Sequence, residues 1–332
     1  MINCNKIKRV ITISLVSILT SSLFSCSYKN NDSLSNIGHI EINDETIDLI
    51  KLESSEDISE EASESTSKSL SFEEKFTTEK IYIDFSAPYA TYSIINDGYA
   101  VLYKIDKSKV DNYKNKIVAV NAGHGTKGGA NIKTFAHPDF SPKYTGGSNA
   151  AGSILSAAVT SGMTFENGMT EANANLVVAY ALKDKLLDAG YSVLMIREND
   201  DCRLDNIART VIANTDADAH IAIHFDSTNS DKGIFYIVPY NDERYLNMEP
   251  LKSNYKNIKK LGDSVIESFR EMGEKIWKDS GIMQGDLTQL SFSTNASIDI
   301  ELGDRKTVLT PEKADTFAEG IKNGLDVYFT NQ

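Results

Sequence analysis

From residue 116 to residue 328 the chain alternates short apolar runs with longer stretches of helical periodicity. One passage, "NANLVVAYALKDKLLDAGYSVLMIR", reads as a helix that ends at Gly190 and leads directly into a strand. We expect strands over 116–122, 191–197, 219–226, 232–238 and 297–302, and helices over 171–188, 203–214, 254–278 and 311–328. This alternation predicts an α/β fold, a three-layer domain with a central mixed twisted sheet and helices on both faces.

The first 25 residues have the pattern of an export signal. Basic residues at positions 6, 8 and 9 precede the apolar run "ITISLVSILTSSLF", which is short for a membrane span. The run leads into "LFSC" at 23–26, which resembles the bacterial lipobox, where the chain is cut before the cysteine and the cysteine receives a diacylglycerol. We therefore expect residues 1–25 to be a lipoprotein signal peptide. Cys26 would then anchor an exported protein to the outer face of the cell membrane, or to the periplasmic side of an outer membrane. The alternative is a signal peptide cut elsewhere, with Cys26 incidental.

Charge and cysteine content restrict which partners the rest of the chain can bind and which disulfides it can form. The net charge of −13 would become −16 once the three basic residues of the signal are removed. An acidic protein of this kind is a poor partner for nucleic acid, which favours a basic surface. Only Cys202 would remain beside Cys26, so an intrachain disulfide framework is excluded and apolar burial has to hold the core together.

Two segments separate the signal from the main domain. Residues 26–79 are rich in serine and glutamate and almost free of aromatic residues, a composition that predicts a disordered linker because too little apolar surface can be buried. Residues 80–114 alternate apolar and polar residues around Asn-Asp-Gly at 96–98, which predicts a β-hairpin. A hairpin is too small to be stable alone, so we expect it to add strands to the main domain or to lie against it.

Three histidines are candidate metal ligands. His220 and His224 in "AHIAIHFD" share one face of a strand but lie about 13 Å apart, too far to bind one ion together. His224 is nearer the carboxyl end of its strand, where ligands gather in open α/β sheets. His124 follows a strand within "NAGHG", whose glycines allow the backbone to aim this side chain out of the sheet edge.

Two glutamates are further candidates for the same site, because each lies at the end of a predicted strand or the start of a predicted helix. Glu301 lies near the end of the strand in "SIDIELGD", where a buried carboxylate is costly unless it is paired or used. Glu171 follows Thr170, a candidate helix cap, so its carboxylate would be stabilised by the helix dipole. Each also has an ordinary interpretation: Glu301 as a surface residue at a strand exit, and Glu171 as a first-turn glutamate that binds nothing.

Taken in order, these motifs resemble the zinc-dependent N-acetylmuramoyl-L-alanine amidases of the amidase-3 type. The family's Gly-His-Gly strand end is here "NAGHG", and its helix opening E-x-x-x-N-L is "EANANL". A strand with an arginine follows in "YSVLMIREND", then R-x-x-x-A-N in "RTVIAN", Ile-His in "IAIHFD", and a final strand with glutamate in "IDIELGD". The resemblance covers roughly 115–328, and it implies that 115–332 is a catalytic domain.

The resemblance implies roles for individual residues. His124, Glu171 and His224 match the family's zinc ligands, and Glu301 matches its catalytic glutamate. Two imidazoles and one carboxylate leave a fourth zinc position open, as in catalytic sites. The implied substrate is peptidoglycan, a glycan strand with its stem peptide, cut at the amide between N-acetylmuramic acid and L-alanine. Glu301 would take a proton from water and pass it to the leaving amine.

The chain also departs from the family pattern. Asn121-Ala122 replace the usual Asp-Pro, and Asp226 replaces an asparagine, which would make the cleft more negative and could raise the pKa of a neighbouring glutamate. The loop 125–169 is long enough to suggest a function, and we expect it to form a wall of the groove. His137 in this loop is a candidate for substrate contact, with a plain surface histidine as the alternative.

These departures leave a second function open. The chain could be a non-catalytic, membrane-anchored relative that binds peptidoglycan or regulates its turnover. A chain that lacked a ligand would favour this alternative, and none is missing here. A regulatory protein partner is compatible with either function, and the sequence identifies none.

Overall fold

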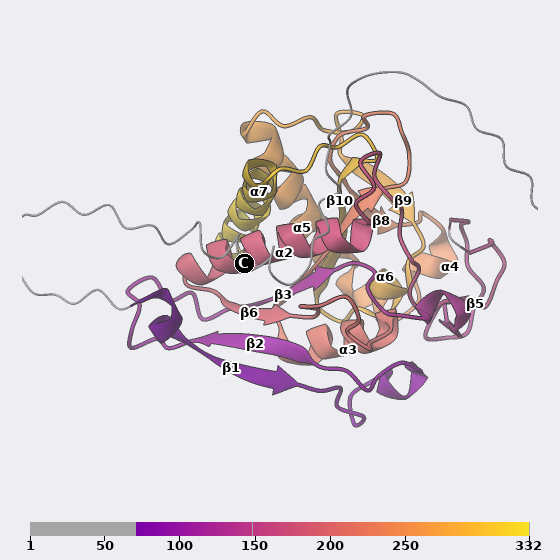
Figure 1. The fold of residues 1–332 in the computed structure, drawn as a ribbon. Helices are drawn as coiled ribbons and strands as arrows, with labels where there is room; N and C mark the ends of the chain where they lie inside the picture. Colours follow the sequence, from indigo (N-terminus) through magenta and orange to yellow (C-terminus); the bar gives the residue numbers. More distant parts are fainter. Residues whose placement is uncertain (1–70, 148, 332) are drawn as a thin grey trace, which may run out of the picture. The chain divides into compact units, whose positions relative to one another are not determined.

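The computed structural model describes residues 71–147 and 149–331. The expected signal peptide, Cys26 and most of the expected linker lie outside the described residues. The core of the domain is an eight-stranded sheet in the order β1-β2-β6-β3-β7-β10-β8-β9 (Figure 1). Its strands are β1 Phe76–Ile81, β2 Ala100–Ile105, β3 Ile117–Ala122, β6 Ser192–Met195, β7 Ala219–Asp226, β8 Phe235–Pro239, β9 Ile282–Gly285 and β10 Ala296–Asp304.

The sheet is mixed, with a parallel centre. Strands β6, β3, β7 and β10 run parallel to one another, whereas β2 pairs with β6 and β8 pairs with β10 in the antiparallel sense. The carboxyl ends of β3, β7 and β10 therefore meet at one edge, which is where side chains from separate strands can form a common site.

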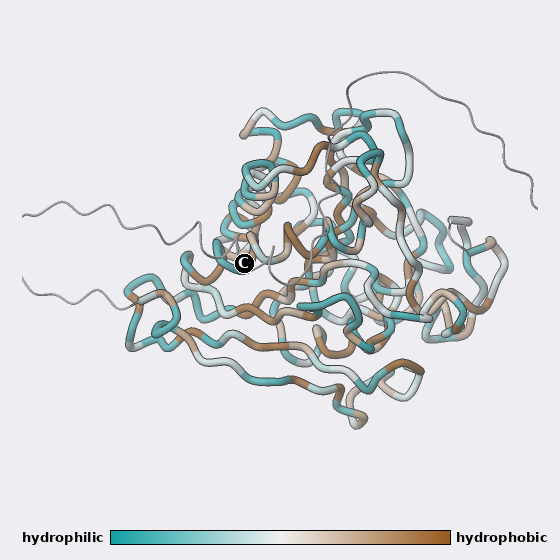
Figure 2. Tube along the Cα trace, in the orientation of Figure 1, coloured by the Kyte–Doolittle hydropathy of each residue, from teal (hydrophilic) through white to brown (hydrophobic). Residues whose placement is uncertain are grey.

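Helices cover both faces of this sheet, so the predicted fold class is confirmed. Helices α2 Glu171–Asp188, α5 Leu251–Glu271 and α7 Pro311–Thr330 pack on one face, and α3 Asn206–Asp216 and α6 Thr288–Phe292 pack on the other (Figure 1). The central strands are mostly hydrophobic and many outer loops are hydrophilic (Figure 2). Apolar residues of the helices pack against these strands on both faces of the sheet. No helix in the described part of the chain is long and apolar enough to cross a membrane.

Strand alternation explains why a polar site can adjoin this core. On β3, Val118 and Val120 face the core under α2, whereas Ala119 packs toward α3. The face toward α3 and α6 becomes polar near the carboxyl ends of β7 and β10. Every second residue of these strands points to this face, and all of these residues except one alanine are histidine, serine or an acid. These residues are His220, Ala222 and His224 on β7, and Ser297, Asp299 and Glu301 on β10.

The lead-in segment differs from the predicted hairpin. Its two strands do add to the sheet, since β1 pairs with β2 and β2 pairs with β6. However, β1 begins at Phe76, inside the expected linker, and the connection 82–99 contains the 3-10 helix η2 Ala90–Tyr92 instead of a tight turn at 96–98. The physical reason is burial: Ile83 and Ala90 pack into the core under α3, which a two-residue turn would not allow.

Other elements were not predicted or have other bounds. Helix α5 ends at Glu271, short of the predicted residue 278, because Gly273 adopts a left-handed conformation and its backbone N–H bonds the Arg270 carbonyl. Strand β9 and the short helices α4 Glu243–Leu246 and α6 carry too few residues to show a period. The long loop contains η3 Gly129–Asn131 and a small second sheet of β4 Lys133–Phe135 and β5 Leu155–Ala157.

Candidate metal centre

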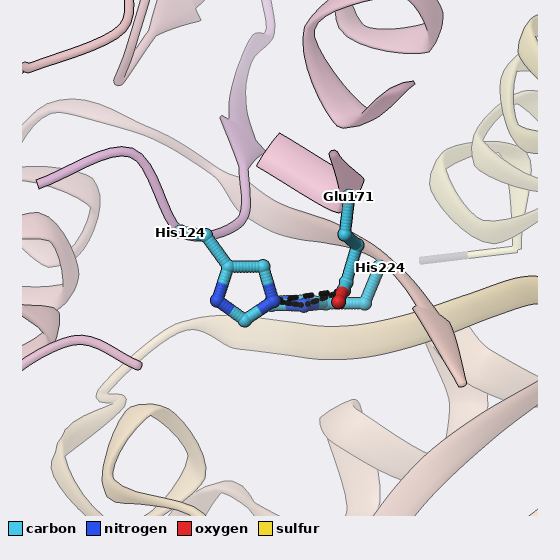
Figure 3. A group of neighbouring side chains, drawn as sticks. All are labelled: His124, Glu171 and His224. Atoms are coloured by element: carbon cyan, nitrogen blue, oxygen red, sulfur yellow. Dashed lines mark hydrogen bonds and ion pairs between the residues drawn. The ribbon is translucent and has the colours of Figure 1, made fainter. Parts of the chain in front are cut away.

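Three side chains from separate elements converge at the carboxyl edge of the sheet (Figure 3). His124 follows β3, Glu171 is the first residue of α2, and His224 lies on β7. Their nitrogen and oxygen atoms lie within 4.8 Å of one another, and they are the only such group of potential metal ligands among the described residues. The structure thus brings together the three predicted ligands and leaves His220 outside the group.

Local backbone chemistry places each of these residues. His124 has a left-handed conformation, with φ of 64°, and its neighbour Gly125 has φ of 66°. A Cβ on Gly123 would lie 2.1 Å from Cε1 of His224, so this position has to be glycine for the two rings to approach. Thr170 caps α2 by accepting a hydrogen bond from the Asn173 N–H at 3.3 Å, which starts the helix at Glu171.

The spacing of the ligand atoms suits a tetrahedral ion. His124 Nε2 lies 2.8 Å from Glu171 Oε1, and His224 Nδ1 lies 3.1 Å from the same oxygen. The two imidazole nitrogens are 3.2 Å apart. Zinc–nitrogen bonds of about 2.0–2.1 Å in a tetrahedral site place neighbouring ligand atoms about 3.3 Å apart. The donor set and its spacing therefore fit zinc.

The charges of the site favour a cation. Burial opposes ionisation of Glu171, but hydrogen bonds from His124 and His224 hold the pKa of this carboxyl well below its usual range. Burial also disfavours a charged His224, yet the negative charges of Asp299 and Glu171 raise its pKa to about 9. A metal cation at this position would compensate the negative charges of Glu171 and Asp299, as a proton on His224 does without a metal.

The long loop supplies outer contacts to two of the ligands. The Thr160 carbonyl accepts a hydrogen bond from His124 Nδ1 at 2.8 Å, which leaves Nε2 as the ligand atom. The Met163 N–H donates to Glu171 Oε2 at 2.8 Å, and the Phe225 N–H donates to Oε1 at 3.2 Å. Gly162 passes so close that a Cβ there would lie 2.7 Å from His124 Cδ2 and 2.9 Å from Glu171 Oε2.

Glu301 lies beside the metal ligands on the next strand. In the parallel register of β7 and β10, Glu301 is opposite His224. Its Oε2 is buried and has no hydrogen-bond partner among the described residues. Burial, reinforced by the nearby charge of Asp299, raises the pKa of Glu301 well above its usual range. Glu301 also lines the cleft, so its carboxylate is in position for proton exchange with a reactant bound there.

The ligands and Glu301 line a cleft of about 630 Å³. Residues 143–147 and 160–163 of the long loop form one part of its lining, and residues 283–289 form another. The expectation that this loop forms a wall of the groove is therefore confirmed.

His137 has a structural role that neither sequence interpretation anticipated. It is fully buried, so it is neither a surface histidine nor a substrate contact, and it does not line the cleft. Its Nε2 bonds Asp286 Oδ1 at 2.8 Å, and its Nδ1 bonds Ser141 Oγ at 2.8 Å. Lys143 Nζ lies 3.2 Å from the same Asp286 oxygen. These contacts fasten the loop wall to the segment between β9 and α6.

Two residues that depart from the family pattern, Asn121 and Asp226, form contacts with neighbouring side chains. Asn121 accepts a hydrogen bond from Arg209 Nη1 at 3.3 Å and contacts His220 Nε2 at 3.2 Å. Burial lowers the pKa of His220 to about 3, so this histidine is neutral in the folded protein. Asp226 forms an ion pair with Lys232, and its negative charge contributes to raising the pKa of Glu301, as the sequence predicted for a neighbouring glutamate.

Comparison with known proteins identifies relatives of this domain. Residues 118–327 match the profile of a family described as N-acetylmuramoyl-L-alanine amidase. The apo N-acetylmuramyl-L-alanine amidase Ami1 of Mycobacterium abscessus is 19% identical over 64% of this chain and 98% of its own, with a TM-score of 0.52. Ami1 of Mycobacterium smegmatis is 17% identical over 67% of this chain and 100% of its own, with a TM-score of 0.55. A search of curated protein sequences gives no match. At these identities the structural likeness shows the fold.

The geometry predicts different metal contents for two histidine variants. His224→Ala removes a ligand atom and should lose bound zinc, whereas His220→Ala should keep one zinc per chain because His220 is not in the ligand group. His220→Ala should still unfold at a lower temperature, since it leaves a cavity and unpaired groups on Asn121 and Ser297. Elemental analysis of zinc-loaded protein, with circular dichroism as the folding control, tests this. Equal zinc loss from both folded variants would contradict the assignment.

A pair of glycine variants tests the contribution of the long loop. Gly162→Ala should push His124 and Glu171 apart and weaken zinc binding by about tenfold or more. Gly168→Ala is the matched control, because Gly168 has a similar left-handed φ of 89° but open space around the added Cβ. Both variants should lose a similar amount of stability from backbone strain. Zinc affinity is measured by chelator competition, and equal affinities in the two variants would show that the loop does not hold the ligands.

Proposed function

Because the chain belongs to the N-acetylmuramoyl-L-alanine amidase family, we propose that it is a zinc-dependent peptidoglycan hydrolase. It cleaves the amide bond between N-acetylmuramic acid and the L-alanine of the stem peptide. One observation carries this proposal: His124, Glu171 and His224 meet at the sheet edge with Glu301 beside them in an open cleft.

The proposed metal would be held by His124 Nε2, Glu171 Oε1 and His224 Nδ1. When bound there, zinc would supply Lewis-acid polarisation of the scissile carbonyl and would make an attacking water more acidic. Three protein ligands leave a position open for reactants, which distinguishes this donor set from a closed structural site.

Glu301 has the properties of the proton-transfer group. It would accept the proton of the attacking water and deliver it to the amide nitrogen. The C–N bond then breaks, and the L-alanine end of the stem peptide leaves as a neutral amine. A group that both takes and returns a proton works best with a pKa near the working pH. Burial and the charge of Asp299 move the pKa of Glu301 upward from its usual range, in the direction of that requirement.

The loop wall would orient the substrate. The loop residues 143–147 and residues 283–289 both line the cleft and contact each other through Asp286, so they form one continuous side along which a glycan strand with its stem peptide would lie. Because His137 and Lys143 both contact Asp286, the loop wall is attached to the segment between β9 and α6 and would present a fixed surface to the substrate.

Substitution of Glu301 separates catalysis from binding. Glu301→Gln keeps the shape of the side chain and removes its ability to accept a proton, so turnover should fall by at least about 10²–10⁴-fold while zinc content stays near normal. Glu166→Gln is the matched control, because Glu166 is exposed and does not line the cleft. The assay is the release of L-alanine amino termini from purified peptidoglycan without new reducing sugar ends.

Two results would count against this assignment. If Glu301→Gln hydrolyses as fast as wild type, Glu301 is not the proton-transfer group. If zinc-loaded wild type releases no L-alanine termini from any peptidoglycan tested, the chain is a non-catalytic relative that binds peptidoglycan.

We also propose that the protein is exported and held at the membrane through a lipid on Cys26, with the part of the acidic segment that precedes the domain, residues 26–70, as a spacer. The support for this is the lipobox-like "LFSC" and the signal-like residues 1–25. Cys26→Ser should stay uncleaved or be released from the membrane fraction. A mutant that is processed like wild type and still fractionates with membranes would refute the anchor.

A further inference from the structure

Asp299 is a buried acid next to the metal centre whose only part in the proposed chemistry so far is the effect of its charge on Glu301. It is only 8% exposed, and its Oδ1 has no hydrogen-bond partner among the described residues. Its Oδ2 lies 3.7 Å from His224 Nε2. Burying a carboxylate without compensation is expensive, so this acid requires an explanation.

The strand register directs Asp299 toward the back of the His224 ring. Asp299 on β10 is opposite Ala222 on β7, and Ala222 precedes His224 on the same face of its strand. The small alanine leaves room for the carboxylate beside the imidazole. Because Nδ1 of His224 faces Glu171 and His124, the Nε2 on the other side of the ring faces Asp299.

Asp299 is not itself among the ligands. The group whose potential ligand atoms lie within 4.8 Å of one another contains His124, Glu171 and His224, and it excludes Asp299. The other two members already have outer partners from the backbone: the Thr160 carbonyl for His124, and the Met163 N–H for Glu171. His224 is the remaining member, and the carboxylate of Asp299 lies on its outer side at 3.7 Å.

We propose that Asp299 is the positioning residue for His224: its carboxylate accepts the Nε2 proton and thereby keeps Nδ1 free to bind zinc. This inference rests on the zinc centre of the proposed function. The present separation of 3.7 Å exceeds a hydrogen bond, and a movement of about 0.8 Å by either side chain would close it. A carboxylate partner also makes the imidazole a stronger donor to the metal, and loss of such a partner typically weakens metal binding by about 10–100-fold.

Two substitutions at this position separate the acceptor from its charge. Asp299→Ala removes both, and should weaken zinc binding by about 10–100-fold. Asp299→Asn keeps an oxygen that can accept the Nε2 proton, so it should bind zinc with an affinity between those of wild type and Asp299→Ala. Asp226→Asn is the matched control, because it removes a nearby charge that is paired with Lys232 and that forms no hydrogen bond or ion pair with His224 among the described residues. Zinc affinity is measured on the full chain by competition with a chelator.

Nitrogen NMR of ¹⁵N-histidine-labelled protein supplies a readout that a merely structural role would not change. The chain has five histidines, so the ring signals can be assigned by single substitutions. In zinc-loaded wild type and in Asp299→Asn, His224 should carry its proton on Nε2. In Asp299→Ala the Nε2 signal should shift and broaden, while the signals of the buried His220 stay unchanged.

The outcomes decide the proposal. Zinc binding by Asp299→Ala within about threefold of wild type, with an unchanged His224 spectrum, would overturn it. If Asp299→Ala does not fold, two other results would overturn the proposal. One is a zinc-loaded wild type in which His224 carries no proton on Nε2, and the other is an Asp299→Asn variant that has lost this proton but binds zinc as tightly as wild type. A protein that binds zinc as described but hydrolyses no peptidoglycan would refute the proposed function and leave this inference standing.

Discussion

The carboxylate of Glu171 lies between two imidazoles, and the architecture of the domain serves to hold these three groups together. Glu171 Oε1 is 2.8 Å from His124 and 3.1 Å from His224, although the histidines are 100 residues apart in the chain. The parallel order of β3 and β7 brings the two histidines to one edge, and the capped start of α2 delivers the acid. A buried acid between two bases is stable only while all three stay in place, so the site depends on the sheet register.

The long loop is part of this arrangement and not an appendage to it. Its segment 160–163 contacts two ligands from outside, and its segment 137–144 is fastened to Asp286. The same polypeptide therefore orients the ligands and forms the wall along which a substrate would lie. This coupling means that a change in the loop far from the reacting atoms can alter metal binding as well as substrate binding.

Much of this could be predicted from the sequence, because it depends on local patterns. The alternation of apolar runs and helical stretches predicted the α/β sandwich, and strand spacing correctly excluded His220 from the ligand group. Features that depend on tertiary contacts were either not predicted or predicted wrongly. The burial of His137 requires Asp286, which lies 149 residues away, and the direction of Asp299 depends on the register with Ala222. The start of β1 and the connection 82–99 depend on a core under α3 that no local pattern reveals.

Anomalous diffraction from crystals of the zinc-loaded protein tests the central claim most directly, because it locates the metal itself. The account predicts one zinc peak per chain, about 2.0–2.2 Å from His124 Nε2, Glu171 Oε1 and His224 Nδ1, with Glu301 outside bonding distance. A zinc ion bound through Asp299 or Glu301 in place of any of these three residues, or the absence of a peak at this edge of the sheet, would contradict it.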